Sequence, residues 1–522
     1  MPIPSRTGTT GSRIWKSIAI LFAAGFAFDL LFWDQDIGIN LPIYAVLIAG
    51  LLLLLYGWRG TSKPAKAVMG GLLIACAMVV IHNSVVSIIL AFVSLFVFAA
   101  LAHEPALRSL FYGVAAVLSN FAMTPVAAFR NFGTAMERGS TSRQGWGLFR
   151  LAIIPVVLVV IYFQIYRVAN PKFDHLTAGS LDTIATWIGD LIANVFTPHS
   201  VFFLFALFLS AGLLFRSAPN WLAPLEQQWT DKLLRARSKR PHWLVPLGMN
   251  ALDRERKMGL LFLVMMNLLL LVVNAVDISW IWWGFEVPKD FSLKQFVHEG
   301  TWLLIISILL SMVIMLRLFR GNQNFHPKNE LLRALAFAWV AQNFILGMSV
   351  FIRNYHYIHF HGLAYKRIGV VVFLGLVMMG LVTLYLKIRH RHSLFHLLRV
   401  NGWAAFVVLV GLTLVNWDGV ITRYNLGHWN QGEVDVDNYL AMSDKVLPIL
   451  YADLATVEKQ MQKHATNEVV WIRRGTMGEF KPELEYRRQH FLDRWAGTGW
   501  QGWNLADART FRTLDKMGLV GR

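Results

Sequence analysis

Polar side chains inside apolar segments are the first residues of this sequence that could do chemistry. Asn267, Asn274 and Asp277 fall at i, i+7 and i+10 of one apolar segment, so a helix places them in one stripe. Gln342 and Asn343 lie in the middle of another segment. Such groups are costly in hydrocarbon and commonly mark a path for a substrate or ion. Alternatively, they join helices by hydrogen bonds worth about 0.6 kcal/mol each.

Two carboxylates, Asp34 and Asp36, follow the first apolar segment. A carboxylate at the outer membrane face could deprotonate an acceptor hydroxyl. Polytopic glycosyltransferases that use lipid-linked sugars place an acidic residue in this loop, and the layout here is similar to theirs. Acidic residues are also ordinary in a short outer loop, and analogy of layout alone does not establish an activity.

Three histidines, His356, His359 and His361, fall within six residues. Imidazole is a common ligand of zinc and copper. No two of these histidines are spaced i, i+4 and no cysteine is near them, so we expect a hydrogen-bonded interfacial segment and no metal. The sequence has no Walker A, Rossmann, HExxH, serine-elbow or kinase signature, and we expect no cofactor.

The composition identifies the class of protein that carries these residues. Of the 522 residues, 56% are hydrophobic and 15% are charged, whereas soluble chains carry roughly 25% charged residues. A soluble multidomain enzyme, a disordered chain and a fibrous repeat are excluded. The sequence predicts an all-α polytopic membrane bundle.

The net charge of +18 fits a membrane protein with basic cytoplasmic loops. No nucleic-acid-binding motif is present, so nucleic acid is not an expected partner. The expected partners of the basic loops are the bilayer and its anionic headgroups.

A membrane span needs about 20 mostly apolar residues, and about eleven segments qualify. They are 14–33, 39–57, 67–82, 85–102, 147–168, 199–215, 258–281, 299–318, 331–352, 368–386 and 401–419. With the N-terminus inside, the inner segments hold 28 Lys and Arg residues and the outer loops hold seven. This distribution satisfies the positive-inside rule and places the C-terminus outside.

The uncharged segment 109–129 is also long enough to cross, which would make twelve spans. Crossing there would turn the basic cluster at 216–257 outward. We therefore interpret the segment as re-entrant or interfacial, although it could cross in exchange for a neighbouring short span.

Four parts follow from this topology. Residues 1–102 form a four-span unit, and 103–146 form the re-entrant or interfacial cytoplasmic segment. Residues 147–419 form a seven-span core with an outer amphipathic helix near 173–196 and a basic cytoplasmic loop at 216–257. Residues 420–522 form a small helical extracytoplasmic module.

Helical spacing and capping residues predict three helices in this module. The first carries apolar residues from Leu447 to Met461 at helical spacing, the second begins at Pro482, and the third is capped by Asn504 and ends near Gly518.

A set of residues around the last two spans carries a family resemblance. Its members are Tyr357, Gly362, Leu363 and Arg367, then Asn416, Asp418, Arg423 and Asn425, and finally Asp437, Tyr439, Trp503 and Asn504. The pattern resembles a bacterial family of polytopic membrane proteins known as domain of unknown function 4173, with relatives under 4153. The resemblance implies a bacterial inner-membrane location and an outward C-terminal tail, and it implies no activity.

The absence of a complete catalytic motif favours a non-catalytic protein. We expect an envelope scaffold, accessory or sensory component whose tail meets an extracytoplasmic protein partner. Two alternatives remain: a secondary transporter that uses the Asn267–Asn274 stripe, and a lipid-linked-sugar glycosyltransferase that uses Asp34 or Asp36.

Overall fold

The computed structural model confirms the all-α class. It describes residues 10–137, 197–235, 251–283, 293–428, 436–465 and 477–520, with scattered positions between 155 and 173. These residues form helices and no β-sheet. The predicted span 147–168 and the predicted outer helix 173–196 fall almost entirely outside the described residues.

Nine helices in the described part of the chain are long and apolar enough to cross a membrane. They are α1 (Thr10–Phe32), α3 (Lys63–His82), α4 (Val85–His103), α5 (Leu110–Glu137), α10 (Ala251–Asp277), α11 (Leu293–Leu318), α12 (Glu330–His361), α13 (Tyr365–His390) and α14 (Leu394–Thr413). Two shorter apolar helices are α2 (Asn40–Tyr56) and α8 (Pro198–Leu214). The chain is a polytopic membrane protein.

The chain folds into two compact units, of which the first comprises residues 1–73, 92–107 and 112–223. Its helix α1 packs against α8 and α2. The ring of Phe28 lies against Tyr44, with centroids 5.1 Å apart, and the Tyr44 hydroxyl is 3.0 Å from Ser210 Oγ. This buried hydrogen bond joins α2 to α8, and so does the Tyr56 hydroxyl, which donates to the Leu214 carbonyl at 3.3 Å.

Helix α5, which covers the segment predicted to be re-entrant or interfacial, is one continuous helix. Asn120 Nδ2 donates to the carbonyls of Gly212 and Phe215, at 2.7 and 3.0 Å, at the C-terminal end of α8. A Cβ on Gly113 would lie 3.3 Å from Val97 in the second half of α4. Contacts near helix ends suit an interfacial location, but α5 is also apolar enough to cross. Its location stays a prediction.

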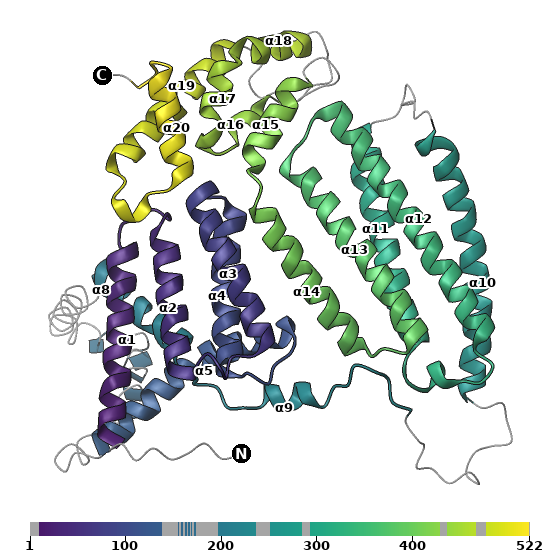
Figure 1. Ribbon diagram of the computed structural model, residues 1–522, viewed down its shortest axis with the longest axis horizontal. Helices are drawn as coiled ribbons and strands as arrows, with labels where there is room; N and C mark the ends of the chain where they lie inside the picture. The colour runs from purple at the N-terminus through teal and green to yellow at the C-terminus, as the bar shows by residue number, and fades with distance from the viewer. Residues whose placement is uncertain are drawn as a thin grey trace. The chain divides into compact units, whose positions relative to one another are not determined.

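The second unit comprises residues 74–91, 108–111 and 224–522, and α12 lies at the centre of its bundle. Helix α12 packs against α10, α11 and α13, while α14 packs against α13 (Figure 1). Trp339 and Leu346 of α12 are each 1% exposed within this core. The π-helix η2 (Ile278–Trp282) directly continues α10. The short helix α9 (Leu222–Gln227) lies before α10 in the sequence.

The predicted polar stripe of α10 is bonded to α12. Asn267 Nδ2 donates to the Leu335 carbonyl at 3.0 Å, and Gln342 Nε2 donates to Asn267 Oδ1 at 2.8 Å. Asn274 Nδ2 donates to the Gln342 carbonyl at 3.1 Å. These three bonds join the two helices.

Replacing Asn267 with leucine removes two of these interhelical bonds. Bonds of this kind average about 0.6 kcal/mol and reach about 1.7 kcal/mol, so we expect Asn267→Leu to destabilise the bundle by roughly 1–2 kcal/mol. Thermal unfolding in nanodiscs measures this, with Leu268→Ala on the exposed face of the same helix as a control. An unchanged midpoint would show that the bonds contribute nothing measurable.

The last predicted span, 401–419, ends earlier than expected. Helix α14 ends at Thr413, and Trp417 begins a separate helix, α15 (Trp417–Gly427). The Asn416 side chain caps α15 by accepting from the Gly419 amide at 3.3 Å. Because Asn416 favours a helix start, the chain breaks where apolar composition alone predicted continuity.

The C-terminal module contains α15 and the helices that follow it. These are α16 (Asp437–Leu440), η4 (Asp444–Val446), α17 (Leu447–Ala452), α18 (Leu454–Ala465), α19 (Met477–Gly497), η5 (Trp500–Gly502) and α20 (Leu505–Lys516). They share one core that includes fully buried Tyr439, Phe480 and Phe491.

Two details of the module differ from the sequence prediction, and a third confirms it. The helix expected from Leu447 to Met461 is two helices, divided at Asp453, and the helix expected to begin at Pro482 begins at Met477. The prediction for Asn504 is confirmed, since its Oδ1 accepts from the Asp507 amide at 2.8 Å as the cap of α20.

Candidate functional site

Four of the twelve residues that carry the family resemblance meet at one place in the second unit. They are Gly362, Leu363, Asp418 and Asn425. This place, which we name the junction network, consists of Gly362, Leu363, Tyr365, Asp418, Asn425, Ser443 and Lys445. It joins the turn between α12 and α13 to α15 and to the start of η4 in the module.

The turn between α12 and α13 is built on Gly362, whose φ is +76°. This left-handed conformation commonly ends helices and favours glycine. Arg367 donates to the His361 carbonyl at 2.6 Å and to the Gly362 carbonyl, and its guanidinium lies 4.5 Å above the Tyr357 ring. The cation therefore binds carbonyls at the C-terminal end of α12.

Asn425 of α15 binds this turn through both the oxygen and the nitrogen of its side-chain amide. The Leu363 amide donates to Asn425 Oδ1 at 2.6 Å, and Asn425 Nδ2 donates to the Leu363 carbonyl at 2.9 Å. Asn425 is 1% exposed. The Gln460 side chain donates to the Asn425 carbonyl at 2.9 Å and accepts from the Tyr439 hydroxyl at 3.1 Å. The network thus reaches into the core of the module.

Gly362 is required both by its conformation and by the closeness of Asn425. A Cβ at this position would lie 2.6 Å from Asn425 Oδ1. We expect Gly362→Ala to destabilise the second unit by about 1–3 kcal/mol through backbone strain and displacement of the amide. Thermal unfolding checks this, with Gly427→Ala as the control because that position has open space. Equal midpoints for the two variants would refute the requirement.

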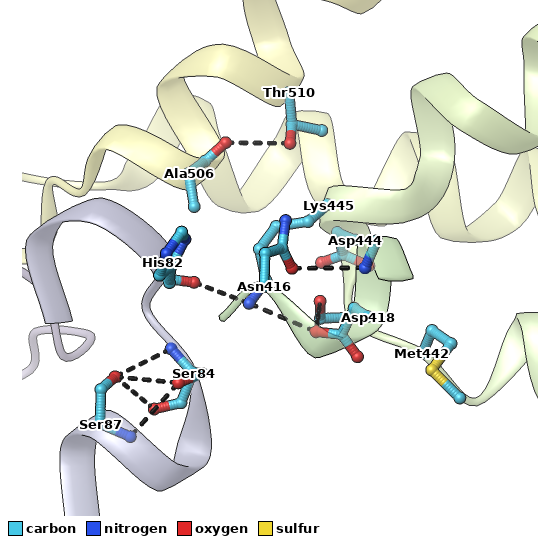
Figure 2. A network of polar contacts seen from close by, with 12 residues as sticks. His82, Ser84, Ser87, Asn416, Asp418, Met442, Asp444, Lys445, Ala506 and Thr510 are labelled. Carbon is cyan, nitrogen blue, oxygen red and sulfur yellow. Dashed lines mark hydrogen bonds and ion pairs between the residues drawn. The ribbon is translucent and has the colours of Figure 1, made fainter. Parts of the chain in front are cut away.

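Asp418 lies at the centre of the network, and its carboxylate is bound by three side chains. Its Oδ1 accepts from the Tyr365 hydroxyl at 2.7 Å, and its Oδ2 accepts from Ser443 Oγ at 2.5 Å. Lys445 Nζ is 3.3 Å from the same Oδ2, and both side chains are less than 9% exposed. Lys445 also donates to the His82 carbonyl at 2.7 Å; Figure 2 shows its ammonium between His82 and Asp418.

The Asp418 carboxyl stays ionised in this setting. Burial raises its pKa, but the hydrogen bonds from Ser443 and Tyr365 and the charge of Lys445 outweigh burial and hold the pKa below its usual range. A carboxylate that is saturated with donors and closed from solvent is suited to holding segments together, and is poorly placed to exchange protons with a substrate.

The lowered pKa predicts how stability depends on pH. Because the folded state favours ionised Asp418, its contribution is complete above the unfolded pKa of about 4 and is lost as the pH falls through the lower folded value. We expect the module to lose stability in acid, and Asp418→Asn to flatten that part of the profile. Unfolding midpoints measured between pH 3 and pH 7 test this; parallel profiles for the two proteins would contradict it.

Other polar candidates lie apart from the junction network. Asp277 of α10 is paired with Arg353 of α12, with Oδ1 and Nη2 2.6 Å apart and both side chains at most 8% exposed. Asn343 donates to the Trp339 carbonyl of its own helix at 2.8 Å. Arg353 was not among the predicted site residues, because the expected span stopped at residue 352 whereas α12 continues to His361.

The three histidines lie at the end of α12 and face different neighbours. His356 Nε2 lies 3.2 Å from the Ile281 carbonyl, and His361 packs edge-on against Tyr357. His359 is exposed. Among the described residues no group of three or more metal-ligating side chains comes together.

The two carboxylates after α1 lie in an exposed loop of the first unit. Asn40 Nδ2 donates to the Asp36 carbonyl at 2.9 Å and fixes this loop, while Asp34 has a positive φ of 53°. Asp29, one turn before the loop, is 3.0 Å from His199 of α8.

The family-like pattern also includes Arg423, Asp437 and Trp503. Arg423 is exposed on α15 and Asp437 begins α16, while Trp503 is 36% exposed beside the cap of α20. None of these three belongs to the junction network.

Comparison with known proteins decides the family. A family model described as a domain of unknown function, DUF4153, matches residues 67–452, about three-quarters of the chain. The chain belongs to this family. DUF4153 is the relative named second in the sequence resemblance, and its match includes every residue of the junction network. Neither a curated protein nor a solved structure matches the chain.

Proposed function

We propose that the chain is a non-catalytic membrane protein that acts as a scaffold, an accessory subunit or a sensory component. Its bundle holds the C-terminal module in one orientation for a protein partner. The observation that carries this proposal is the Asp418 carboxylate of the module. It accepts from the Tyr365 hydroxyl of α13, and its ion-pair partner Lys445 donates to the His82 carbonyl outside the module. A buried ion pair adds little net stability over apolar residues, but breaking it is costly. Such a pair suits a protein whose module must keep one arrangement.

Exposed aromatic side chains on the module support the proposal of a protein partner. Tyr486 and Trp500 are 66% and 59% exposed, and aromatic side chains are enriched in protein interfaces. The family resemblance implies a bacterial inner membrane. Inner basic loops and sparsely charged outer loops favour an orientation with the N-terminus inside and the module outside. On this topology the partner is an extracytoplasmic protein.

Photo-cross-linking in native membranes tests the proposal. A photoreactive amino acid replaces Tyr486 in the full chain, and a control chain carries it at Leu271, which is 57% exposed on the apolar helix α10. We expect a discrete protein adduct from position 486 alone, and its loss when Lys445→Met releases the module. Identical adducts from both positions, or none from position 486, would contradict the proposal. Turnover of a lipid-linked sugar that Asp34→Asn abolishes would replace it with the glycosyltransferase function.

One observation favours a transporter as a second candidate. Three acceptor oxygens between α10 and α12, Asn274 Oδ1, Asp277 Oδ2 and Gln342 Oε1, are buried without a hydrogen-bond partner in the described part of the chain. Unpaired acceptors of this kind can bind a proton, a cation or water. The transporter function predicts flux in proteoliposomes that falls in Asn274→Leu; unchanged flux would remove these oxygens from consideration.

A further inference from the structure

A cavity of about 300 Å³ lies among α11, α12 and α13. These helices lie side by side in the second unit (Figure 1). Thr301 near the start of the apolar part of α11, Tyr357 near the end of α12 and Lys366 near the start of α13 all line the cavity. The cavity is therefore at one end of the bundle, where a membrane protein meets the headgroups.

The lining is amphiphilic along the axis of α13. Lys366 and Arg367 lie at the start of this helix, and Val370 and Phe373 follow one and two turns later. Across from them, Ile305 lies one turn beyond Thr301 on α11. With a rise of about 1.5 Å per residue, the distance along α13 from the charged rim to Phe373 is roughly 10 Å.

The rim carries two positive charges and no acidic side chain among the residues that line the cavity. Arg367 is held at the turn by its bonds to the His361 and Gly362 carbonyls, so its charge is fixed there. Lys366 is exposed and has no ion-pair partner within the described residues. The hydroxyl of Thr301, a residue only 5% exposed, has no hydrogen-bond partner among the described residues.

The apolar wall is continuous with the exterior of the bundle. Trp302 and Phe373 both line the cavity and are 59% and 40% exposed. In a bilayer these surfaces face hydrocarbon, so an acyl chain can enter from the side without crossing water. The volume is at the lower limit of ligand pockets, which suits one chain better than a large soluble ligand.

We propose that this cavity binds one acyl chain of an anionic phospholipid, with the phosphate at Lys366 and Arg367. The apolar walls bind the chain by van der Waals packing, because a chain that is already in hydrocarbon gains nothing by transfer from water. The fixed guanidinium of Arg367 and the exposed ammonium of Lys366 favour a negative headgroup over a zwitterionic one. The Thr301 hydroxyl in the lining is available to the glycerol ester groups, whereas the Asn354 amide donates to the Arg367 carbonyl at 3.3 Å.

Native mass spectrometry of the full chain tests this site, with phosphatidylglycerol and phosphatidylcholine as matched probes. We expect preferential retention of phosphatidylglycerol, reduced about fivefold by Lys366→Gln. Lys481→Gln, which changes an exposed lysine of the module, is the charge control. Gly369→Leu places a side chain in the cavity and should remove bound lipid. Gly375→Leu, on the same helix with equally open space, should not.

Three results would overturn the proposal. Equal retention of the two lipids would exclude charge recognition, and equal loss in Gly369→Leu and Gly375→Leu would exclude the cavity. Displacement of the lipid by excess glycerol phosphate would identify a soluble phosphate site. Because Lys366 is exposed, Lys366→Gln leaves the fold intact and keeps the test decisive if Gly369→Leu fails to fold.

Discussion

Lys445→Met is expected to release the C-terminal module from its fixed position. The substitution keeps the apolar stem but leaves the Asp418 carboxylate buried without its counter-charge, with two neutral hydroxyl donors remaining. Breaking a buried pair in this way costs about 3–5 kcal/mol. It also leaves the His82 carbonyl without the bond from Lys445. Limited proteolysis and unfolding of the full chain in nanodiscs measure the loss.

Two further variants separate the ion pair from general damage. Asp418→Asn combined with Lys445→Met removes both charges, and we expect it to recover a large part of the loss, because no uncompensated charge remains. Lys481→Met changes an exposed lysine of the same module and should stay within about 0.5 kcal/mol of wild type. A double variant no more stable than Lys445→Met would show that Lys445 acts by some means other than pairing with Asp418.

The second large effect is expected at the ion pair between α10 and α12. Arg353→Met leaves Asp277 buried without a counter-charge between α10 and α12. We again expect a loss of about 3–5 kcal/mol, and Asp277→Asn together with Arg353→Met should recover much of it. Unfolding midpoints of the purified chain in nanodiscs provide the measurement.

An exposed ion pair offers the matched control for Arg353. Arg317 of α11 is 2.9 Å from Glu255 of α10, with side chains 56% and 35% exposed. Solvent screens such a pair, so Arg317→Met should cost less than about 1 kcal/mol. If Arg317→Met and Arg353→Met had the same effect, burial would not be the source of the stabilisation.

Local patterns allowed much of the fold to be predicted. Apolar segments of sufficient length identified most of the long helices, because the period and length of such segments are local properties. The Asn504 cap was also predictable, since the side chain and the amide that it binds are only three residues apart. The break between α14 and α15 was missed because Val415 and Trp417 continue the apolar composition past Asn416.

The candidate site was predictable as a set of residues but not as an arrangement. The family-like pattern included Gly362, Asp418 and Asn425, which the structure brings together. It did not include Tyr365 or Lys445 as partners of Asp418, because Tyr365 lies 53 positions away and no periodicity links them. Asp277 and Arg353 are 76 positions apart. Their pairing could not be predicted either, because no local sequence pattern links them.

Hydrogen exchange by mass spectrometry, on wild-type chain and Lys445→Met in nanodiscs, tests most directly whether the junction network holds the module. We predict slow exchange in α15 and α17 of the wild type. In the variant, a loss of about 3 kcal/mol corresponds to exchange roughly 100-fold faster there, with α10 and α11 unchanged. Equal exchange in α15 and α17 of the two proteins would contradict the account.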